Sequence, residues 1–189
     1  MDDGAGTLAP RGMDVDEFIA WAMAQTDGRR YELVAGEVVA MSPERAVHTR
    51  TKYRVWAALS AALAVRGLPC EAFGDGLSVR IDRRTLYEPD ALVRCGEKLD
   101  GEVVEIGDPV IVVEVVSPSS GALDKGAKLD DYFRLPSVRH YLIVRTEKRT
   151  VIHHARAGDD RIETRIVRSG ALHLDPPGLT VEVESFFES

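Results

Sequence analysis

Hydrophobic residues recur at helical spacing in two stretches of the chain. Near the start, Asp14 and Glu17 stand three positions apart, the spacing of a capping box, just ahead of an apolar helical face. From 44 to about 66, apolar residues again return every three or four positions, and Gly67 supplies a stop signal. A further helix is predicted over about 124–134.

Short β-rich segments fill most of the remaining chain. The segment RYELVAGEVVAMSP predicts a hairpin that turns at Ala35 and Gly36. A β-branched run from Val110 to Val116 predicts the most buried strand, in the middle of a sheet covered on both faces, and Glu114 alone interrupts it. The other expected strands are CEAF, LSVRI, YEPDALV, HYLIV, TVIHHARA, RIETRIV and LTVEV. This order predicts an α/β (α+β) fold, a mixed β-sheet flanked by helices with additional antiparallel strands.

The length of 189 residues suffices for one sizeable core, so we expect a single domain over 13–189 behind a flexible arm at 1–12. Hydrophobic residues at 44% and charged residues at 29% exclude a disordered or fibrous chain. No apolar run approaches the roughly 20 residues that span a bilayer, which predicts a cytoplasmic protein with no membrane partner. Two cysteines, Cys70 and Cys95, are too few for a disulfide framework, and we expect both to be reduced.

The net charge of -7 argues against a nucleic-acid partner, because such binding depends on Lys and Arg neutralising phosphates. The distribution of charge weakens that objection, since eight bases stand against three acids between 45 and 84. Taken alone, this basic cluster is interpreted as a solvated helix face followed by a charged turn. Its members are Arg45, Arg50, Lys52, Arg54, Arg66, Arg80, Arg83 and Arg84.

Two acidic residues fall on neighbouring predicted strands. Burying the ionised Glu114 in an apolar strand without a partner would cost several kcal/mol, so Glu114 either forms an ion pair, reaches solvent at a strand end, or holds a metal. Asp90 follows Pro89 at the start of YEPDALV. Because strands separated by one loop are commonly adjacent, the two carboxylates are expected to converge. Hard cations such as Mg²⁺ and Mn²⁺ prefer oxygen ligands of this kind.

A lysine lies on the helix that follows the Glu114 strand. Lys128 belongs to DKGAKLDDY, with Tyr132 one turn later and Lys125 one turn earlier on the same face. A lysine in this place could orient an attacking water or stabilise charge that develops on a phosphate. The alternative is a solvated helix lysine.

Several stretches, taken in order, carry a resemblance to a known family. They are Pro89 with Asp90, VVEVVSPSS, DKGAKLDDY and VRHYLIV, preceded by YELVAGEVVAMSP and His48. Together they resemble the Uma-two family of restriction endonucleases, within the PD-(D/E)XK nuclease superfamily, over nearly the whole chain from about Phe18 to Phe187. The resemblance implies a restriction-endonuclease-like fold and metal-dependent cleavage of DNA.

The resemblance also implies roles for individual residues. Asp90 and Glu114 would ligate the catalytic Mg²⁺, or Mn²⁺, together with the backbone carbonyl of Val115. Lys128 would be the catalytic lysine, and Lys125 fits that role less well. The superfamily pattern expects this lysine two residues after the glutamate, where the chain has Val116.

Besides Lys125, three further residues are candidates for accessory groups: Glu32, His48 and Tyr132. Glu32 and His48 match recurring positions of the family, although an exposed strand residue and a surface histidine are the favoured interpretations. Tyr132 could support Lys128. His153 and His154 are adjacent on a strand, so their side chains point to opposite faces and cannot chelate one ion together.

The function predicted from these features is a Mg²⁺-dependent endonuclease that hydrolyses phosphodiester bonds of DNA, most easily as a homodimer if both strands are cut. One alternative is a domain that keeps the nuclease fold but acts as a DNA-binding or interaction module. Another is a purely structural ion pair between Lys128 and Glu114.

Overall fold

The computed structural model describes residues 11–116, 122–158 and 161–187, and leaves out the side chains of 122–125. The chain forms two compact units, Met1–Pro43 with Arg80–Tyr87, and Glu44–Val79 with Glu88–Ser189. The single domain expected over 13–189 stays a prediction. None of the helices described is long and apolar enough to cross a membrane.

The first unit holds the predicted N-terminal helix and hairpin. The capping box is present, since Asp14 and Glu17 each accept the backbone N–H of the other at 3.0 Å. The hairpin turns at Ala35 and Gly36, both at positive φ, as predicted. The elements of this unit are α1 (Val15–Met23), β1 (Tyr31–Val34), β2 (Glu37–Ala40) and β5 (Thr85–Tyr87), and they enclose a core of Val15, Phe18, Leu33 and Leu86.

The second unit is built on a six-stranded sheet in the order β11-β10-β9-β8-β6-β3. As predicted, the run containing Glu114 lies inside this sheet, where it is parallel to β9 and antiparallel to β6. The strands are β3 (Cys70–Gly74), β6 (Ala91–Cys95), β8 (Ile111–Val116), β9 (His140–Arg145), β10 (Thr150–Arg156) and β11 (Ile162–Val167).

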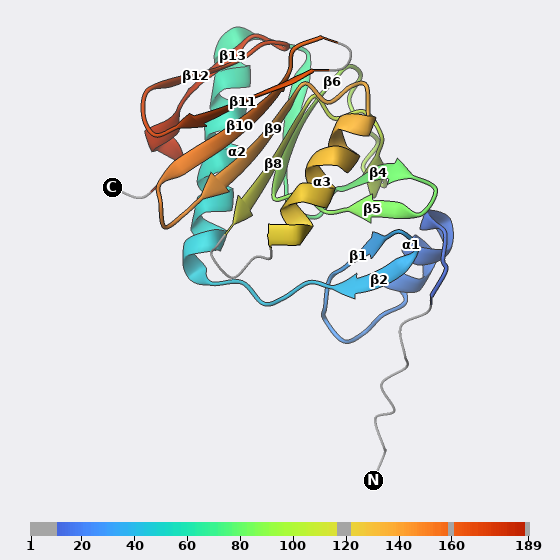
Figure 1. Ribbon diagram of the computed structural model, residues 1–189. Helices are drawn as coiled ribbons and strands as arrows, with labels where there is room; N and C mark the ends of the chain where they lie inside the picture. Colours follow the sequence, from blue (N-terminus) through green and yellow to red (C-terminus); the bar gives the residue numbers. More distant parts are fainter. Residues whose placement is uncertain (1–10, 117–121, 159–160, 188–189) are drawn as a thin grey trace. The chain divides into compact units, whose positions relative to one another are not determined.

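Helices cover both faces of this sheet (Figure 1). On one face, α2 (Ala46–Arg66) packs Val55 and Leu59 against alternate residues of β6, β8 and β9. On the other face, α3 (Ala122–Arg134) sets Tyr132 against Tyr141 of β9, with ring centroids 5.1 Å apart. The mixed sheet flanked by helices is therefore confirmed.

Smaller elements complete the fold. They are β4 (Ser78–Asp82), β7 (Glu105–Ile106), β12 (Ala171–Leu174), β13 (Leu179–Glu182) and the 3₁₀ helix η1 (Val183–Phe186). The β12-β13 hairpin and η1 pack on the α2 side of the core. The strands β5, β7 and β12 were not predicted; β5 and β7, of three and two residues, are too short to show a clear alternation.

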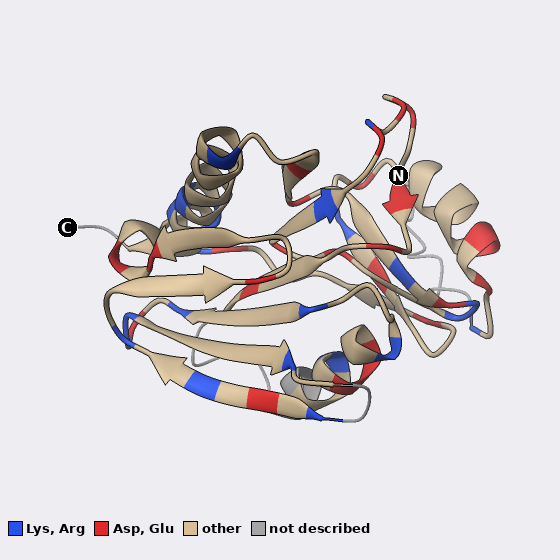
Figure 2. Ribbon diagram, turned by 90° about the horizontal axis from the view of Figure 1, so that it is seen from above, with Lys and Arg blue, Asp and Glu red and all other residues tan. Residues whose placement is uncertain are grey.

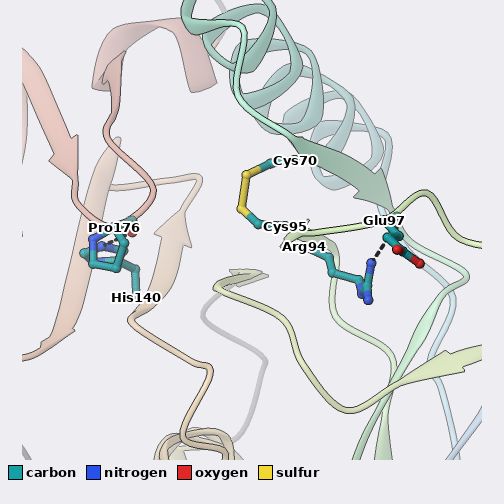
Figure 3. Close-up of a disulfide and its surroundings, with 6 residues drawn as sticks. All are labelled: Cys70, Arg94, Cys95, Glu97, His140 and Pro176. Carbon is teal, nitrogen blue, oxygen red and sulfur yellow. Dashed lines mark hydrogen bonds between the residues drawn. A yellow bond between two sulfur atoms is a disulfide. The ribbon is translucent and has the colours of Figure 1, made fainter.

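A disulfide joins Cys70 and Cys95, so the expectation that both are reduced was wrong (Figure 3). The antiparallel register of β3 and β6 pairs these two residues directly. They are 25 positions apart along the chain, and only the pairing of the strands makes them neighbours.

Candidate active site

Asp90 lies where two central strands separate. The paired part of β6 and β8 ends at Ala91 and Val113, and the backbone N–H of Asp90 still donates to the Val113 carbonyl at 3.0 Å. One step further, the N–H of Val115 has no strand partner on this side and donates instead to Asp90 Oδ2 at 2.5 Å. The side chain of Asp90 contacts Lys52 of α2, whereas that of Glu114 contacts Lys128 of α3. The expected adjacency of the two acid-bearing strands is therefore observed.

A buried lysine from α2 contacts the other oxygen of Asp90. Lys52 Nζ lies 2.6 Å from Asp90 Oδ1 and 3.3 Å from Asp75 Oδ2, and it also pairs with Glu44 Oε1. Lys52 and Asp90 are each only 6% exposed. The prediction that the basic cluster is a solvated helix face was therefore wrong for Lys52.

Burial and charge act in opposite directions on this pair. Burial alone would lower the pKa of Lys52, but the carboxylates of Asp90 and Glu44 raise it to about 12. Burial raises the pKa of Asp90 above its ordinary value, against the opposing effects of Lys52 and the Val115 N–H. We regard both groups as charged at neutral pH, because a contact of 2.6 Å in a buried site favours the ion pair.

Glu114 is held by two residues of α3. Its Oε1 accepts hydrogen bonds from Lys128 Nζ at 3.2 Å and from Tyr132 Oη at 3.0 Å. Lys128 and Tyr132 are one helical turn apart, so they reach the same carboxylate oxygen from one face of α3, as their spacing predicts. Lys128 is buried, which excludes the solvated helix lysine. An ion pair between Lys128 and Glu114, as the structural alternative predicts, is present.

The chemistry of these donors fits a hard divalent cation. Asp90, Glu114 and the backbone carbonyl of Val115 all offer oxygen donors, which hard divalent cations prefer. Within the described residues, no group of three or more His, Cys, Asp or Glu side chains is arranged to hold a metal ion. Since Mg²⁺ usually keeps several waters and binds one or two carboxylates, two acids are enough for it.

The accessory candidates fall in different places. Glu32 belongs to the first unit and is buried, so the expectation of an exposed strand residue was wrong. His48 is half-buried on α2, and its Nε2 is buried without a hydrogen-bond partner among the described residues, unlike an ordinary surface histidine. The side chain of Lys125 lies outside the described residues.

The two adjacent histidines have separate partners, as expected for opposite faces of a strand. His153 Nε2 lies 2.9 Å from Nδ1 of His140, while His154 Nδ1 lies 2.8 Å from the Thr164 hydroxyl.

Lys52 was not among the residues predicted for the site. One signal could have found it: Lys52 lies three positions before Val55 and seven before Leu59, so it is on the apolar face of the long helix. A lysine in that position needs a buried acid, and Asp90 supplies it.

A comparison with solved structures agrees with the fold. A solved structure from Anabaena variabilis ATCC 29413, described as a "putative nuclease belonging to DUF820", has a TM-score of 0.73 over 92% of this chain and 97% of its own. It is 12% identical in sequence, so it supports the fold alone.

Two proteins of Synechocystis sp. are more similar in sequence. Uncharacterized protein slr1290 is 26% identical over 91% of this chain and 90% of its own length. Uncharacterized protein sll1609 is 24% identical over 68% of this chain and 73% of its own. The model of the family Uma2, described as "Putative restriction endonuclease", matches residues 15–185. The chain therefore belongs to the Uma2 family.

Proposed function

We propose that this protein is a metal-dependent endonuclease that hydrolyses phosphodiester bonds of DNA. Asp90, Glu114 and the backbone carbonyl of Val115 would hold Mg²⁺ or Mn²⁺. One observation carries the proposal: two acids stand at the same end of adjacent strands, and a buried lysine of the following helix is hydrogen-bonded to the second acid. In phosphodiester hydrolysis, a carboxylate can bind the metal ion and a nearby lysine can stabilise the negative charge that develops on the phosphate.

Each residue has a task in this scheme. When bound, the metal ion would polarise the scissile phosphate and lower the pKa of a water molecule. Lys128, held by Glu114, would orient that water and stabilise negative charge on the phosphate. Tyr132 fixes the Glu114 carboxylate and therefore the place of Lys128.

Lys52 has a different task. Its ammonium contacts Asp90 Oδ1 at 2.6 Å, so it neutralises Asp90 in the metal-free protein. Any cation that binds this oxygen competes with Lys52, which makes Lys52 a determinant of metal affinity.

The proposal is tested by cleavage of plasmid and oligonucleotide DNA in Mg²⁺ or Mn²⁺, with EDTA as the metal-free control. We expect Glu114→Gln and Lys128→Met each to lower the rate by at least about 100-fold, because each removes charge stabilisation from the reaction. Lys148→Met, which replaces an exposed lysine in the β9-β10 turn, is the matched control and should retain the rate. Equal rates for Lys128→Met and Lys148→Met would contradict the role of Lys128.

A second candidate is a nuclease-fold module that binds DNA or a protein without cutting. The pairing of each acid with its own lysine favours it, because neither carboxylate needs a metal to be neutralised. Calorimetric titration of Mg²⁺ and Mn²⁺ into the wild type and Glu114→Ala separates the candidates. A titration without heat in the wild type would favour the module.

Two further parts of the proposal concern assembly and location. Cutting both strands of a duplex is easiest for a symmetric homodimer, which light scattering coupled to size exclusion would detect. A DNA substrate inside the cell would place the protein in the cytoplasm, and fractionation with an epitope tag tests this.

A further inference from the structure

The helix α2 is the basic part of an acidic protein. Its 21 residues include no Asp or Glu, and apart from Lys52, which Asp90 and Glu44 neutralise, they include Arg50, Arg54 and Arg66, whereas the whole chain has a net charge of -7. Figure 2 shows Lys and Arg without acidic residues along this helix. Such a local concentration of positive charge favours a polyanion.

A groove runs along the exposed side of α2. Its volume is about 750 Å³, within the range of ligand sites, and it is lined by Arg50, Tyr53 and Arg54 together with Thr49, Ala57, Ala58 and, from η1, Ser185. The two arginines supply donors for phosphate oxygens. Small alanine side chains leave room for a flat ring beside the helix.

The groove adjoins the candidate active site. A smaller hollow of about 190 Å³ is lined by Lys52, Trp56 and Asp90, and it shares Thr49 and Tyr53 with the groove. Tyr53 therefore stands between the arginines and the carboxylate that would hold the metal. The groove and the hollow, which Asp75 also lines, therefore meet at Thr49 and Tyr53.

Tyr53 is placed as a stacking platform. It is 66% exposed, unusual for a large aromatic side chain, and its ring centroid lies 5.8 Å from that of Trp56. Trp56 is fixed by a hydrogen bond from its Nε1 to the Ala72 carbonyl at 3.0 Å. An exposed ring supported by a fixed ring on a helix can accept a nucleobase with little loss of side-chain freedom.

We propose that the α2 groove, lined by Arg50, Tyr53 and Arg54, binds unpaired nucleotides of DNA and delivers the neighbouring phosphodiester to Asp90. The inference rests on the proposed nuclease function and narrows its substrate to DNA with a single-stranded segment. In a duplex, each base is already stacked on its neighbours, so Tyr53 has no free base face to contact. The arginines bind phosphates of any sequence, and the stacking is equally tolerant of sequence.

The test is fluorescence anisotropy in EDTA with a labelled single-stranded oligonucleotide and the same sequence as a duplex hairpin. We expect tighter binding of the single strand, and a loss of about tenfold or more for Tyr53→Ala, the usual effect of removing one stacking platform. Tyr53→Phe should bind like the wild type. Val65→Ala is the matched control, because Val65 is on the same helix, is 85% exposed and does not line the groove.

The salt dependence gives an independent readout. For single strands, Arg50→Gln or Arg54→Gln should each reduce the slope of log Kd against log salt by about 0.7, the value for one lost phosphate contact. Circular dichroism of each variant shows whether the fold is kept.

The possible failures are distinguishable. If Tyr53→Ala binds single strands as well as Val65→Ala does, or if the duplex binds as tightly as the single strand, the groove proposal is overturned. If Tyr53-dependent binding is present but Mg²⁺ or Mn²⁺ produces no cleavage, the groove is supported and the nuclease function fails.

Discussion

Replacing Lys52 by methionine should destabilise the protein by leaving Asp90 charged and buried. The Lys52 pKa, raised from 10.5 to about 12, corresponds to about 2 kcal/mol of favourable interaction. This contribution is complete below pH 10.5 and is lost as the pH rises through about 12. Removal of one partner of a buried pair typically costs about 3 to 5 kcal/mol, because the remaining charge keeps its desolvation penalty. We therefore expect a loss of about 3 kcal/mol at pH 7.

Urea unfolding, followed by tryptophan fluorescence, measures this loss. The double variant Lys52→Met with Asp90→Asn removes both charges, so it should be more stable than Lys52→Met alone by about 1 to 3 kcal/mol. Lys148→Met is again the exposed control, with an expected change within about 0.5 kcal/mol. A loss below about 1 kcal/mol for Lys52→Met, or a double variant no more stable than the single one, would refute the buried ion pair.

Further predictions concern metal affinity, the support of Glu114, and acid stability. In calorimetry, Lys52→Met should bind Mg²⁺ or Mn²⁺ more tightly than the wild type, since it removes the competing ammonium; weaker binding would oppose that role. Tyr132→Phe should lose about 1 kcal/mol in urea unfolding, for one hydrogen bond to Glu114, and should cut DNA more slowly without losing DNA affinity in EDTA. Arg156→Met removes three hydrogen bonds to backbone carbonyls around the end of α3 and should cost about 3 kcal/mol in the same assay. Burial, and to a smaller extent the neighbouring His140, lowers the pKa of His153 from 6.5 to about 4. As the pH falls, the unfolded state therefore takes up this proton before the folded state does. The free energy of unfolding should fall by up to about 3 kcal/mol between pH 6.5 and pH 4. His153→Gln should show less of this fall in urea unfolding at successive pH values.

Local patterns predicted the elements around the site. The capping box at Asp14 and Glu17 and the left-handed Gly67 after α2 need only neighbouring residues, and both are observed. The β-branched run around Glu114 identified the central strand, because only a strand covered on both faces is so uniformly apolar. The shared face of Lys128 and Tyr132 follows from helical spacing.

Features that depend on pairing between elements were not predictable in this way. Lys52 is 38 positions from Asp90, and no local sequence pattern predicts that α2 packs next to the end of β6. The Cys70–Cys95 disulfide likewise follows from the register of β3 and β6. The basic cluster in the sequence suggested that Lys52 is exposed to solvent. Its burial instead depends on how α2 packs in the folded protein.

The most direct test of the account is single-turnover cleavage of DNA by Asp90→Asn in Mg²⁺. Asparagine keeps the size of the side chain and can still accept the Val115 N–H, but it lacks the negative charge that a cation needs. We predict normal DNA affinity in EDTA and a cleavage rate at least about 100-fold below that of the wild type. Full Mg²⁺-dependent cleavage by Asp90→Asn would contradict the central claim that this carboxylate holds the catalytic metal.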